Sequence, residues 1–222
     1  MIRYITGSLF YNKNRLFFEN NIPVTKKNYW ELNDYGWEEI DAKYNMNKYL
    51  GVLDCGGDGE CLFKCIAEAV NNHKSNPDNF IDYIYLRKMI SKNIEVTLFE
   101  DYIENYKLQK TIGELNGFWD PNSINTIQDF KKIILAKDFW GDYLCLNILS
   151  KKMKTNFIVF DDEFKIILRQ SDFNKTILLV CIDSLHFQLL SLFDGKKIKT
   201  IINNKNIEKK IFKTLELKNS NE

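Results

Sequence analysis

The sequence predicts an α+β fold, because segments with helical spacing of apolar residues come first and short strand-like runs follow them. The chain has 222 residues, of which 45% are hydrophobic and 27% are charged, a balance typical of one sizeable globular domain. It shows no internal repeat and no long Gly-, Ser- or Pro-rich linker. We expect a domain over residues 51–195, an N-terminal extension over 1–50 packed on it, and a Lys/Asn-rich C-terminal helix or tail over 196–222.

Four segments have the apolar spacing of helices. They are 61–72, 82–106, 126–136 and 139–153. The second is long enough for one or two amphipathic helices. In the third, Thr126 is a candidate N-cap with Asp129 three residues on, and in the fourth Asp142 stands near the start, after a Gly turn. The tail has apolar spacing that allows one more helix, from about Lys205 to Leu217.

Short apolar runs separated by polar turns predict the strands. They are 156–161, 165–169, 175–182 and 186–193, with 51–55 as a shorter strand or extended segment before the first helix. Side chains alternate between the two faces of a strand, so His186, Gln188 and Leu190 would share one face.

Charge and composition exclude several classes of protein. The net charge of +1 gives no basic excess for nucleic-acid binding. No run approaches the ~18 apolar residues of a membrane span, and the first residues lack the basic-then-apolar layout of a signal peptide. Five cysteines, an odd number without a secretion signal, argue against a disulfide framework. We expect a cytoplasmic protein, with the nucleus as an alternative, and no membrane or nucleic-acid partner.

The stretch "GGDGECLFKCIAEAV", 56–70, places a cysteine at the start of an apolar helix after a glycine-rich loop. A cysteine acts as a nucleophile in its thiolate form, which the unpaired N–H groups at a helix N-terminus favour. Acyl transfer from an amide also needs backbone N–H donors for the oxyanion, and glycines let a loop turn its amides inward. The candidate donors are the amides of Gly59, Glu60 and Cys61. Asp58 could hold the loop through side-chain hydrogen bonds to the backbone.

The alternative for each cysteine is a place in the core, because a cysteine on an apolar helix is usually a small buried residue. We expect this for Cys55, Cys65, Cys145 and Cys181. The spacing of the first three cysteines matches no zinc pattern, so no metal site is expected.

Only two histidines could serve as the base for a nucleophilic cysteine. His186 opens an apolar strand and, from the residues alone, is either this base or a packed core group. His73 lies in the polar stretch "NNHKSNPDN" and is expected at the surface.

The hexapeptide "DGECLF", 58–63, resembles the Asp-Gly-x-Cys-Leu-Phe signature of the ovarian-tumour (OTU) cysteine proteases, which are deubiquitinases. "YLRKMISKNI" resembles the next helix of that family, and "FWGDYLCLNILSKKMKTNFIVFD" its Trp-Gly turn, helix and strand. "DSLHFQLL" resembles the strand that carries the catalytic histidine. The similarity spans roughly 51–193 and implies an OTU-like (papain-like) fold, with a small central sheet flanked by helices.

The resemblance also implies roles for particular residues. Cys61 matches the nucleophile, His186 the general base, and Asp58 with the loop to Cys61 matches the oxyanion-hole segment. Trp140 would wall the channel that admits Gly-Gly, unless it is only a core aromatic. Leu185, next to the histidine, would be a second substrate contact.

The third member of the triad is left open by the sequence. The family usually has Asn or Asp two residues after the histidine, where this chain has Gln188. A Gln amide oxygen can accept the imidazole N–H, but the side chain is longer and neutral. Some family members take the acid from a segment before the nucleophile, where Asp34, Asp41 or Asp54 could serve.

The function implied is hydrolysis of isopeptide or peptide bonds after the C-terminal Gly-Gly of ubiquitin, by a monomer acting on ubiquitin or polyubiquitin chains without a cofactor. Two alternatives stay open. Gln188 is compatible with a catalytically weak or dead OTU-like ubiquitin-binding module, and a ubiquitin-like modifier with the same Gly-Gly tail could be the substrate. The small size and Asn/Lys-rich composition, with the resemblance, suggest a protein of a large DNA virus that acts in the host cytoplasm.

Overall fold

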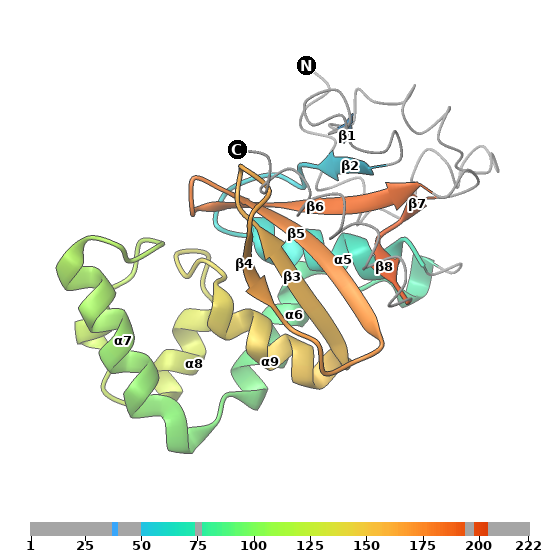
Figure 1. The fold of residues 1–222 in the computed structure, drawn as a ribbon. Coiled ribbons are helices and arrows are strands. Elements are labelled where there is room, and N and C mark those ends of the chain that lie inside the picture. Colours follow the sequence, from blue (N-terminus) through green and yellow to red (C-terminus); the bar gives the residue numbers. More distant parts are fainter. Residues whose placement is uncertain (1–36, 40–49, 74–76, 194–197, 204–222) are drawn as a thin grey trace.

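The computed structural model describes residues 37–39, 50–73, 77–193 and 198–203, and the fold is α+β as predicted (Figure 1). The α-helices are α5 (Cys61–Asn71), α6 (Tyr83–Asn93), α7 (Phe99–Ile112), α8 (Ile127–Leu135) and α9 (Tyr143–Met153). Short 3-10 turns are η3 (Pro77–Asn79), η4 (Val96–Leu98) and η5 (Pro121–Ser123). The strands are β1 (Trp37–Glu39), β2 (Leu50–Leu53), β3 (Thr155–Phe160), β4 (Ile166–Arg169), β5 (Lys175–Ile182), β6 (His186–Phe193), β7 (Ile198–Lys199) and β8 (Ile201–Ile202).

The strands form one mixed sheet in the order β1-β2-β6-β5-β3-β4, with β7 beside β6 and β8 beside β5. Only β3 and β5 are parallel among these described pairs, and all the others are antiparallel. Two sequence-distant strands therefore lie together at the centre: β2, which precedes the first helix, pairs with β6 near the end of the chain. This pairing brings the residues that follow β2 close to the start of β6.

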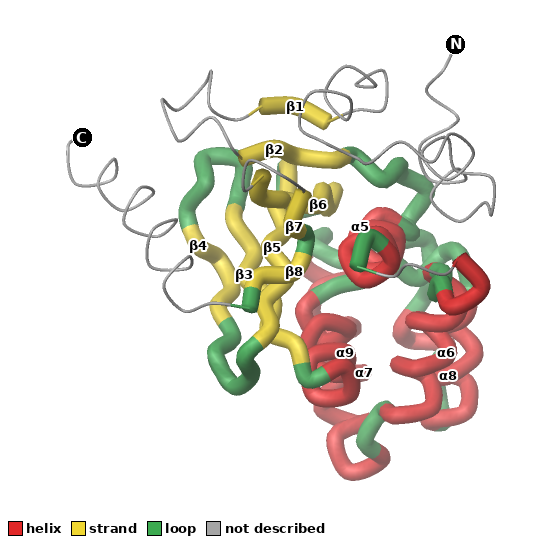
Figure 2. The backbone as a smooth tube through the Cα atoms, turned by 90° about the vertical axis from the view of Figure 1, so that its right-hand side faces the viewer, coloured by secondary structure: helices red, strands yellow, loops and turns green. Residues whose placement is uncertain are grey.

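The helices cover one face of the sheet, as the view in Figure 2 shows. α5 packs directly against β6, while α6, α8 and α9 form the rest of the helical layer. Most of the core lies between the layers, where apolar residues of α5, α6 and α9 meet those of β3, β5 and β6. A smaller apolar cluster, which includes Leu178, Val180 and Leu190, lies on the other face of the sheet. No helix in the described ranges is long and apolar enough to cross a membrane.

The predicted helix starts are confirmed at two caps. The Thr126 hydroxyl accepts the backbone N–H of Asp129 at 3.2 Å and begins α8. The carboxylate of Asp142 accepts the N–H of Cys145 at 3.2 Å and begins α9. Both caps satisfy amides that a helix N-terminus otherwise leaves unpaired. The segment 82–106 forms two helices, α6 and α7, with η4 between them.

The expected flanking segments are described only in part. Residues 37–39 form an edge strand against β2, and residues 198–202 continue the sheet as β7 and β8, beyond the expected domain end at 195. The helix expected from Lys205 to Leu217 lies outside the described residues, as does most of the 1–50 extension. All five cysteines are free thiols and buried, and Cys55, Cys65, Cys145 and Cys181 belong to the main core as expected.

Candidate active site

The loop between β2 and α5 carries left-handed backbone conformations at three positions. Gly56 has φ of 93°, Asp58 of 67° and Gly59 of 74°. Glycine adopts this region without the steric cost of a Cβ atom. The carboxylate of Asp54 accepts the N–H of Gly56 at 2.8 Å and so fixes the first turn of the loop. The loop therefore reverses direction tightly and delivers Cys61 as the first residue of α5.

Gly59 is required by its surroundings as well as by its backbone angle. A Cβ atom at this position would lie 2.3 Å from Cδ1 of Trp140 and 3.0 Å from the carbonyl oxygen of Lys137. Trp140 thus covers the loop directly before the cysteine. This contact places the indole directly beside the loop that leads to Cys61, and its role as a channel wall stays a prediction.

The backbone amides before Cys61 are available as donors. The first intrahelical hydrogen bond of α5 is donated by Lys64 to the carbonyl of Glu60, at 2.9 Å. Among the described residues, no acceptor takes the N–H groups of Asp58, Gly59, Glu60 or Cys61. Glu60 occupies the N-cap position but makes no side-chain cap. Such unpaired N–H groups at a helix N-terminus favour negative charge, as an oxyanion requires.

Cys61 is held against the first residues of β6. The backbone N–H of Phe187 donates to Sγ of Cys61 at 3.5 Å. The turn that leads into β6 is tight: Asp183 and Ser184 both have positive φ, and the N–H of Leu185 donates to the carbonyl of Ile182 at 3.0 Å. This turn brings the start of β6, and with it His186, to the N-terminus of α5.

The imidazole of His186 lies between a carboxylate and a thiol. Its Nε2 is 3.0 Å from Oδ1 of Asp54. The hydrogen bond to Asp54, followed by the neighbouring Cys61 thiol, raises the pKa of His186 to about 10, and burial opposes the shift. The same hydrogen bond lowers the pKa of Asp54. With Nε2 bonded to the carboxylate, Nδ1 is the ring nitrogen left for the thiol.

The sheet register explains why Asp54 reaches the histidine. The last pair between β2 and β6 is Leu53 with Leu189, so the next position of β2 stands opposite Gln188. Gln188 and His186 share one face of β6, because they are two residues apart. An acid that follows β2 therefore lies on the same side of the sheet as the imidazole, opposite Gln188 and two residues along β6 from His186. Asp54 therefore reaches His186 from the neighbouring strand, and not through a two-residue spacing within β6.

Gln188, expected as the third member, does not contact the imidazole, since no hydrogen bond joins these two described residues. Nε2 of the ring is bonded instead to Asp54, the residue that directly follows β2. Of the earlier acids that the sequence left open, the structure brings Asp54 to the ring. Asp34 and Asp41 lie outside the described residues.

The side chains of two other predicted site residues are exposed. The Asp58 side chain is 74% exposed and faces Lys137 at 3.9 Å, so the expectation that it braces the loop by bonding the backbone is wrong. Only its backbone, at positive φ, takes part in the loop. Leu185 is exposed on the β5–β6 turn and does not line the cleft described next, although it adjoins the histidine.

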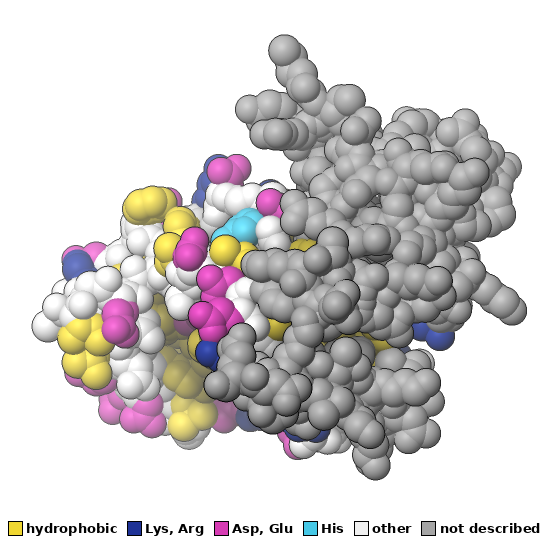
Figure 3. Space-filling view, turned by 45° about the horizontal axis from the view of Figure 1, so that its top comes forward, with side chains coloured by type: hydrophobic (Ala, Val, Ile, Leu, Met, Phe, Trp, Pro, Cys, Tyr) yellow, Lys and Arg dark blue, Asp and Glu magenta, His cyan; other side chains and the backbone are white. Residues whose placement is uncertain are grey.

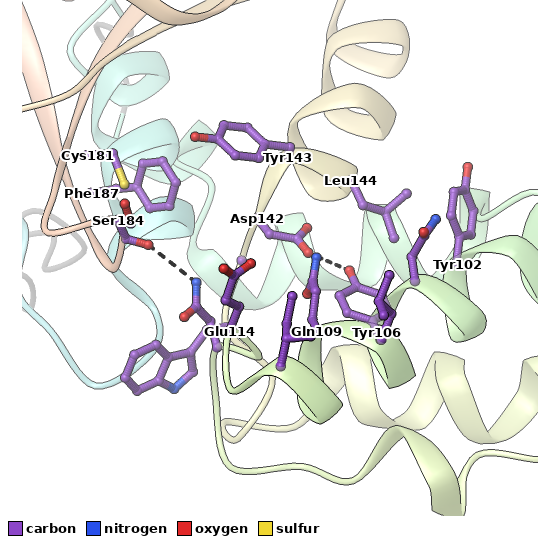
Figure 4. A pocket seen from close by; sticks show the side chains of 16 residues that line it. Tyr102, Tyr106, Gln109, Glu114, Asp142, Tyr143, Leu144, Cys181, Ser184 and Phe187 are labelled. Atoms are coloured by element: carbon purple, nitrogen blue, oxygen red, sulfur yellow. Dashed lines mark hydrogen bonds between the residues drawn. The ribbon is translucent and has the colours of Figure 1, made fainter. Parts of the chain in front are cut away.

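A cleft of about 430 Å³ opens between α7, the start of α9 and the β5–β6 turn (Figure 4). Cys61 and His186 do not line it, but its lining includes Trp140, which covers Gly59, and Phe187, whose N–H donates to Cys61. Trp140, Ser184 and Phe187 line the end near the candidate site, and residues of α7 line the far side. Figure 3 shows a histidine at the molecular surface with acidic and hydrophobic side chains around it. A cleft of this kind can hold an extended peptide next to the thiol.

A half-buried hydrogen bond joins two residues that line this cleft. The hydroxyl of Tyr106 on α7 donates to Asp142 at 2.5 Å, and the two side chains point toward one another in Figure 4. Burial raises the pKa of both groups. The bond joins α7 to the N-cap of α9, which follows Trp140. The sequence predicted the Asp142 cap but not the role of Tyr106. The one sequence feature that could have indicated this role is a polar aromatic residue on the apolar face of α7.

The sequence pattern of a known family covers most of this region. Residues 56–187, more than half of the chain, match the OTU-like cysteine protease family. Two viral proteins named as putative ubiquitin thioesterases are similar. The one from Tipula iridescent virus is 23% identical over 155 residues, and the one from Invertebrate iridescent virus 3 is 25% identical over 149 residues. These alignments cover 68% and 65% of this chain but 17% and 16% of the relatives, so the chain spans less than a fifth of their length.

Solved structures of OTU domains are also similar. An OTU domain in complex with ubiquitin is 24% identical, with a TM-score of 0.48, over 76% of this chain and 84% of that one. The Hazara virus OTU bound to ubiquitin is 14% identical, with a TM-score of 0.41, over 72% of this chain and 87% of that one.

Proposed function

Because the chain belongs to the OTU-like cysteine protease family, we propose that it is a deubiquitinase that hydrolyses isopeptide or peptide bonds after the C-terminal Gly-Gly of ubiquitin. One observation carries the proposal: Asp54 bonds Nε2 of His186, and the Cys61 thiol lies beside the same ring. This is the arrangement of a nucleophile, a base and a residue that orients the base. The names of the viral relatives support ubiquitin as the modifier.

The first half of the reaction begins with the transfer of one proton from Cys61 to His186. The imidazole takes the proton of the thiol, and the thiolate attacks the carbonyl carbon of the terminal glycine. The carbonyl oxygen becomes an oxyanion, which the loop amides before Cys61 stabilise. The imidazolium then protonates the leaving amine, the carbon–nitrogen bond breaks, and a thioester links ubiquitin to Sγ.

In the second half, water replaces the amine. His186 takes a proton from the water, whose oxygen attacks the thioester carbonyl and again forms an oxyanion at the loop. The carbon–sulfur bond breaks, ubiquitin leaves with a free carboxylate, and the thiol regains its proton from the imidazolium. Asp54 keeps the proton of the ring on Nε2 and favours the charged form in both halves. Every step uses a group of this chain, so the proposal includes no metal and no organic cofactor.

The cleft lined by Trp140 and Phe187 is the proposed place for the substrate tail. Gly-Gly has no side chains, so it can pass beside the exposed face of the Trp140 indole towards Cys61. We assign Trp140 as the wall of this channel. Leu185, exposed on the turn before the histidine, is the second assigned contact, at the rim rather than inside the cleft.

The test is turnover of ubiquitin carrying a fluorogenic amine on its C-terminus. Wild-type protein should release the amine, and Cys61→Ala should release none. The matched control is Cys65→Ala, one helical turn on and fully buried, which removes a thiol that donates to the carbonyl of Phe187 and bonds neither Cys61 nor His186. A wild type that binds ubiquitin without turnover would contradict hydrolysis and favour a binding module. Turnover of a ubiquitin-like modifier alone would contradict the choice of ubiquitin.

A further inference from the structure

Arg87, on α6, is a charged side chain buried in the core next to the nucleophile loop. It is 2% exposed, and it lies on the face of α6 that also carries the buried Leu86 and Ile90. A buried arginine is costly unless its donors are satisfied. Its position in the apolar stripe of the helix is the sequence signal that could have marked it.

The guanidinium bonds four backbone carbonyls. Nη1 donates to the carbonyls of Ile134 and Ala136, at 2.8 and 2.9 Å. Nη2 donates to the carbonyls of Gly59 and Phe139, at 3.2 and 2.9 Å. Three of these acceptors belong to the end of α8 and the segment that leads to Trp140. The fourth belongs to the loop directly before the nucleophile.

Arg87 also contacts the nucleophile helix itself. Its Cζ lies 4.4 Å from the centre of the Phe63 ring, in a cation–π contact within the first turn of α5. One side chain therefore connects the loop, the start of α5 and the segment that carries Trp140. Trp140 in turn covers Gly59. Arg87 and Trp140 therefore both contact Gly59.

The bond to Gly59 fixes the direction of one peptide unit. In a trans peptide the C=O and N–H point in opposite directions, and the structure has no cis peptide among its described residues. With the Gly59 oxygen turned to Arg87, the N–H of Glu60 points away from Arg87. If this peptide turned over, a carbonyl oxygen would replace that donor, and it would repel a developing oxyanion.

We infer that Arg87 is a positioning residue, which holds the peptide between Gly59 and Glu60 in the orientation that keeps a donor available to the oxyanion. The inference rests on the proposed function. The inference goes beyond the proposed function, because it assigns the orientation of the loop peptide to Arg87. The Arg87 side chain touches neither the substrate nor the thiol. Lysine cannot replace it, since a single ammonium cannot reach four carbonyls in a planar arrangement.

The test compares Arg87→Lys and the neutral Arg87→Gln with wild type and with Ser91→Ala. Ser91 lies on the same helix and donates to the carbonyl of Lys131 at 3.1 Å, so its loss weakens the α6–α8 contact without touching Gly59. For each variant, kcat and KM are measured on the fluorogenic ubiquitin amide, together with Tm. The rate of alkylation of Cys61 by iodoacetamide is followed by mass spectrometry. Alkylation displaces iodide and builds no oxyanion.

We expect folded Arg87→Lys to lose kcat by about 10²-fold or more, the scale of a lost oxyanion donor, with KM and Cys61 alkylation close to wild type. Arg87→Gln should lose at least as much, and Ser91→Ala should keep kcat. Unchanged kcat in folded Arg87→Lys or Arg87→Gln would overturn the inference, as would an equal loss in alkylation or in Ser91→Ala. A wild type without turnover would instead refute the proposed function, before any variant is compared.

Discussion

Asp54 and His186 are 132 positions apart in the sequence, yet Oδ1 of one lies 3.0 Å from Nε2 of the other. The contact exists because β2 pairs with β6 and ends one residue before the acid. Asp54 also accepts the N–H of Gly56. One carboxylate therefore orients the imidazole and anchors the loop that leads to Cys61, so the triad and the oxyanion loop share a support.

Asp54→Asn should lower kcat on ubiquitin substrates by about 10²-fold or more, because an amide can no longer stabilise the imidazolium or hold its tautomer. Gln188→Ala is the matched control, on the same face of β6 as the histidine. It should stay within about 3-fold of wild type, as expected for a residue without a bond to the ring. Steady-state kinetics on both variants decide whether Asp54 or Gln188 orients the imidazole. A larger loss in Gln188→Ala than in Asp54→Asn would reverse the assignment.

Asp54→Asn should also move the alkaline limb of the kcat profile to lower pH. The carboxylate is the main cause that raises the pKa of His186 from 6.5 to about 10. A raised pKa keeps the imidazolium, which protonates the leaving amine, present up to higher pH. Without the carboxylate this form is lost earlier as pH rises, so the limb should shift by at least about one pH unit. Profiles of kcat against pH that superimpose for the two proteins would contradict this account of the pKa.

Gly59→Ala should destabilise the protein and abolish most turnover. The new Cβ would lie 2.3 Å from the Trp140 ring, at a φ of 74° that costs other residues about 1–2 kcal/mol. Gly57→Ala is the control in the same loop, because a Cβ there meets nothing within 4 Å. It should change the free energy of unfolding by less than about 0.5 kcal/mol. Denaturant titration and kinetics measure both, and equal effects would show that the Trp140 contact is unimportant.

Tyr106→Phe should lower the free energy of unfolding by about 1–3 kcal/mol, since it leaves the half-buried Asp142 without its hydroxyl donor. The comparison is Tyr143→Phe, which removes a hydroxyl from a side chain that is 43% exposed. That variant should be nearly neutral. Urea unfolding monitored by circular dichroism gives both values. A neutral Tyr106→Phe would mean that water replaces the hydroxyl and that the bond does not support α9.

The helices and strands were predictable because each depends on local spacing. The apolar positions of α5, the Thr126 cap and the four late strands all follow from residues within a few positions of one another. Cys61 and His186 could be assigned because they stand within short motifs that resemble a family. The helices and strands agree with the sequence expectations, and the roles of Cys61 and His186 stay predictions.

The third member of the triad could not be assigned in this way. Its identity depends on the pairing of β2 with β6, and periodicity within either strand says nothing about which strands pair. The same limit applies to Arg87, whose four acceptors come from two distant segments. The Asp58 side chain failed as a loop brace because positive φ at that residue turns it to solvent, which composition alone does not reveal.

The most direct test of the central claim uses ubiquitin with an electrophile at its C-terminus, incubated with wild type, Cys61→Ala and His186→Ala. Mass spectrometry locates any adduct. We predict that wild type forms one covalent adduct at Cys61, that Cys61→Ala forms none, and that His186→Ala reacts much more slowly. An adduct at another cysteine, or folded wild-type protein that binds the probe without reacting, would contradict the claim that Cys61 is a ubiquitin-directed nucleophile.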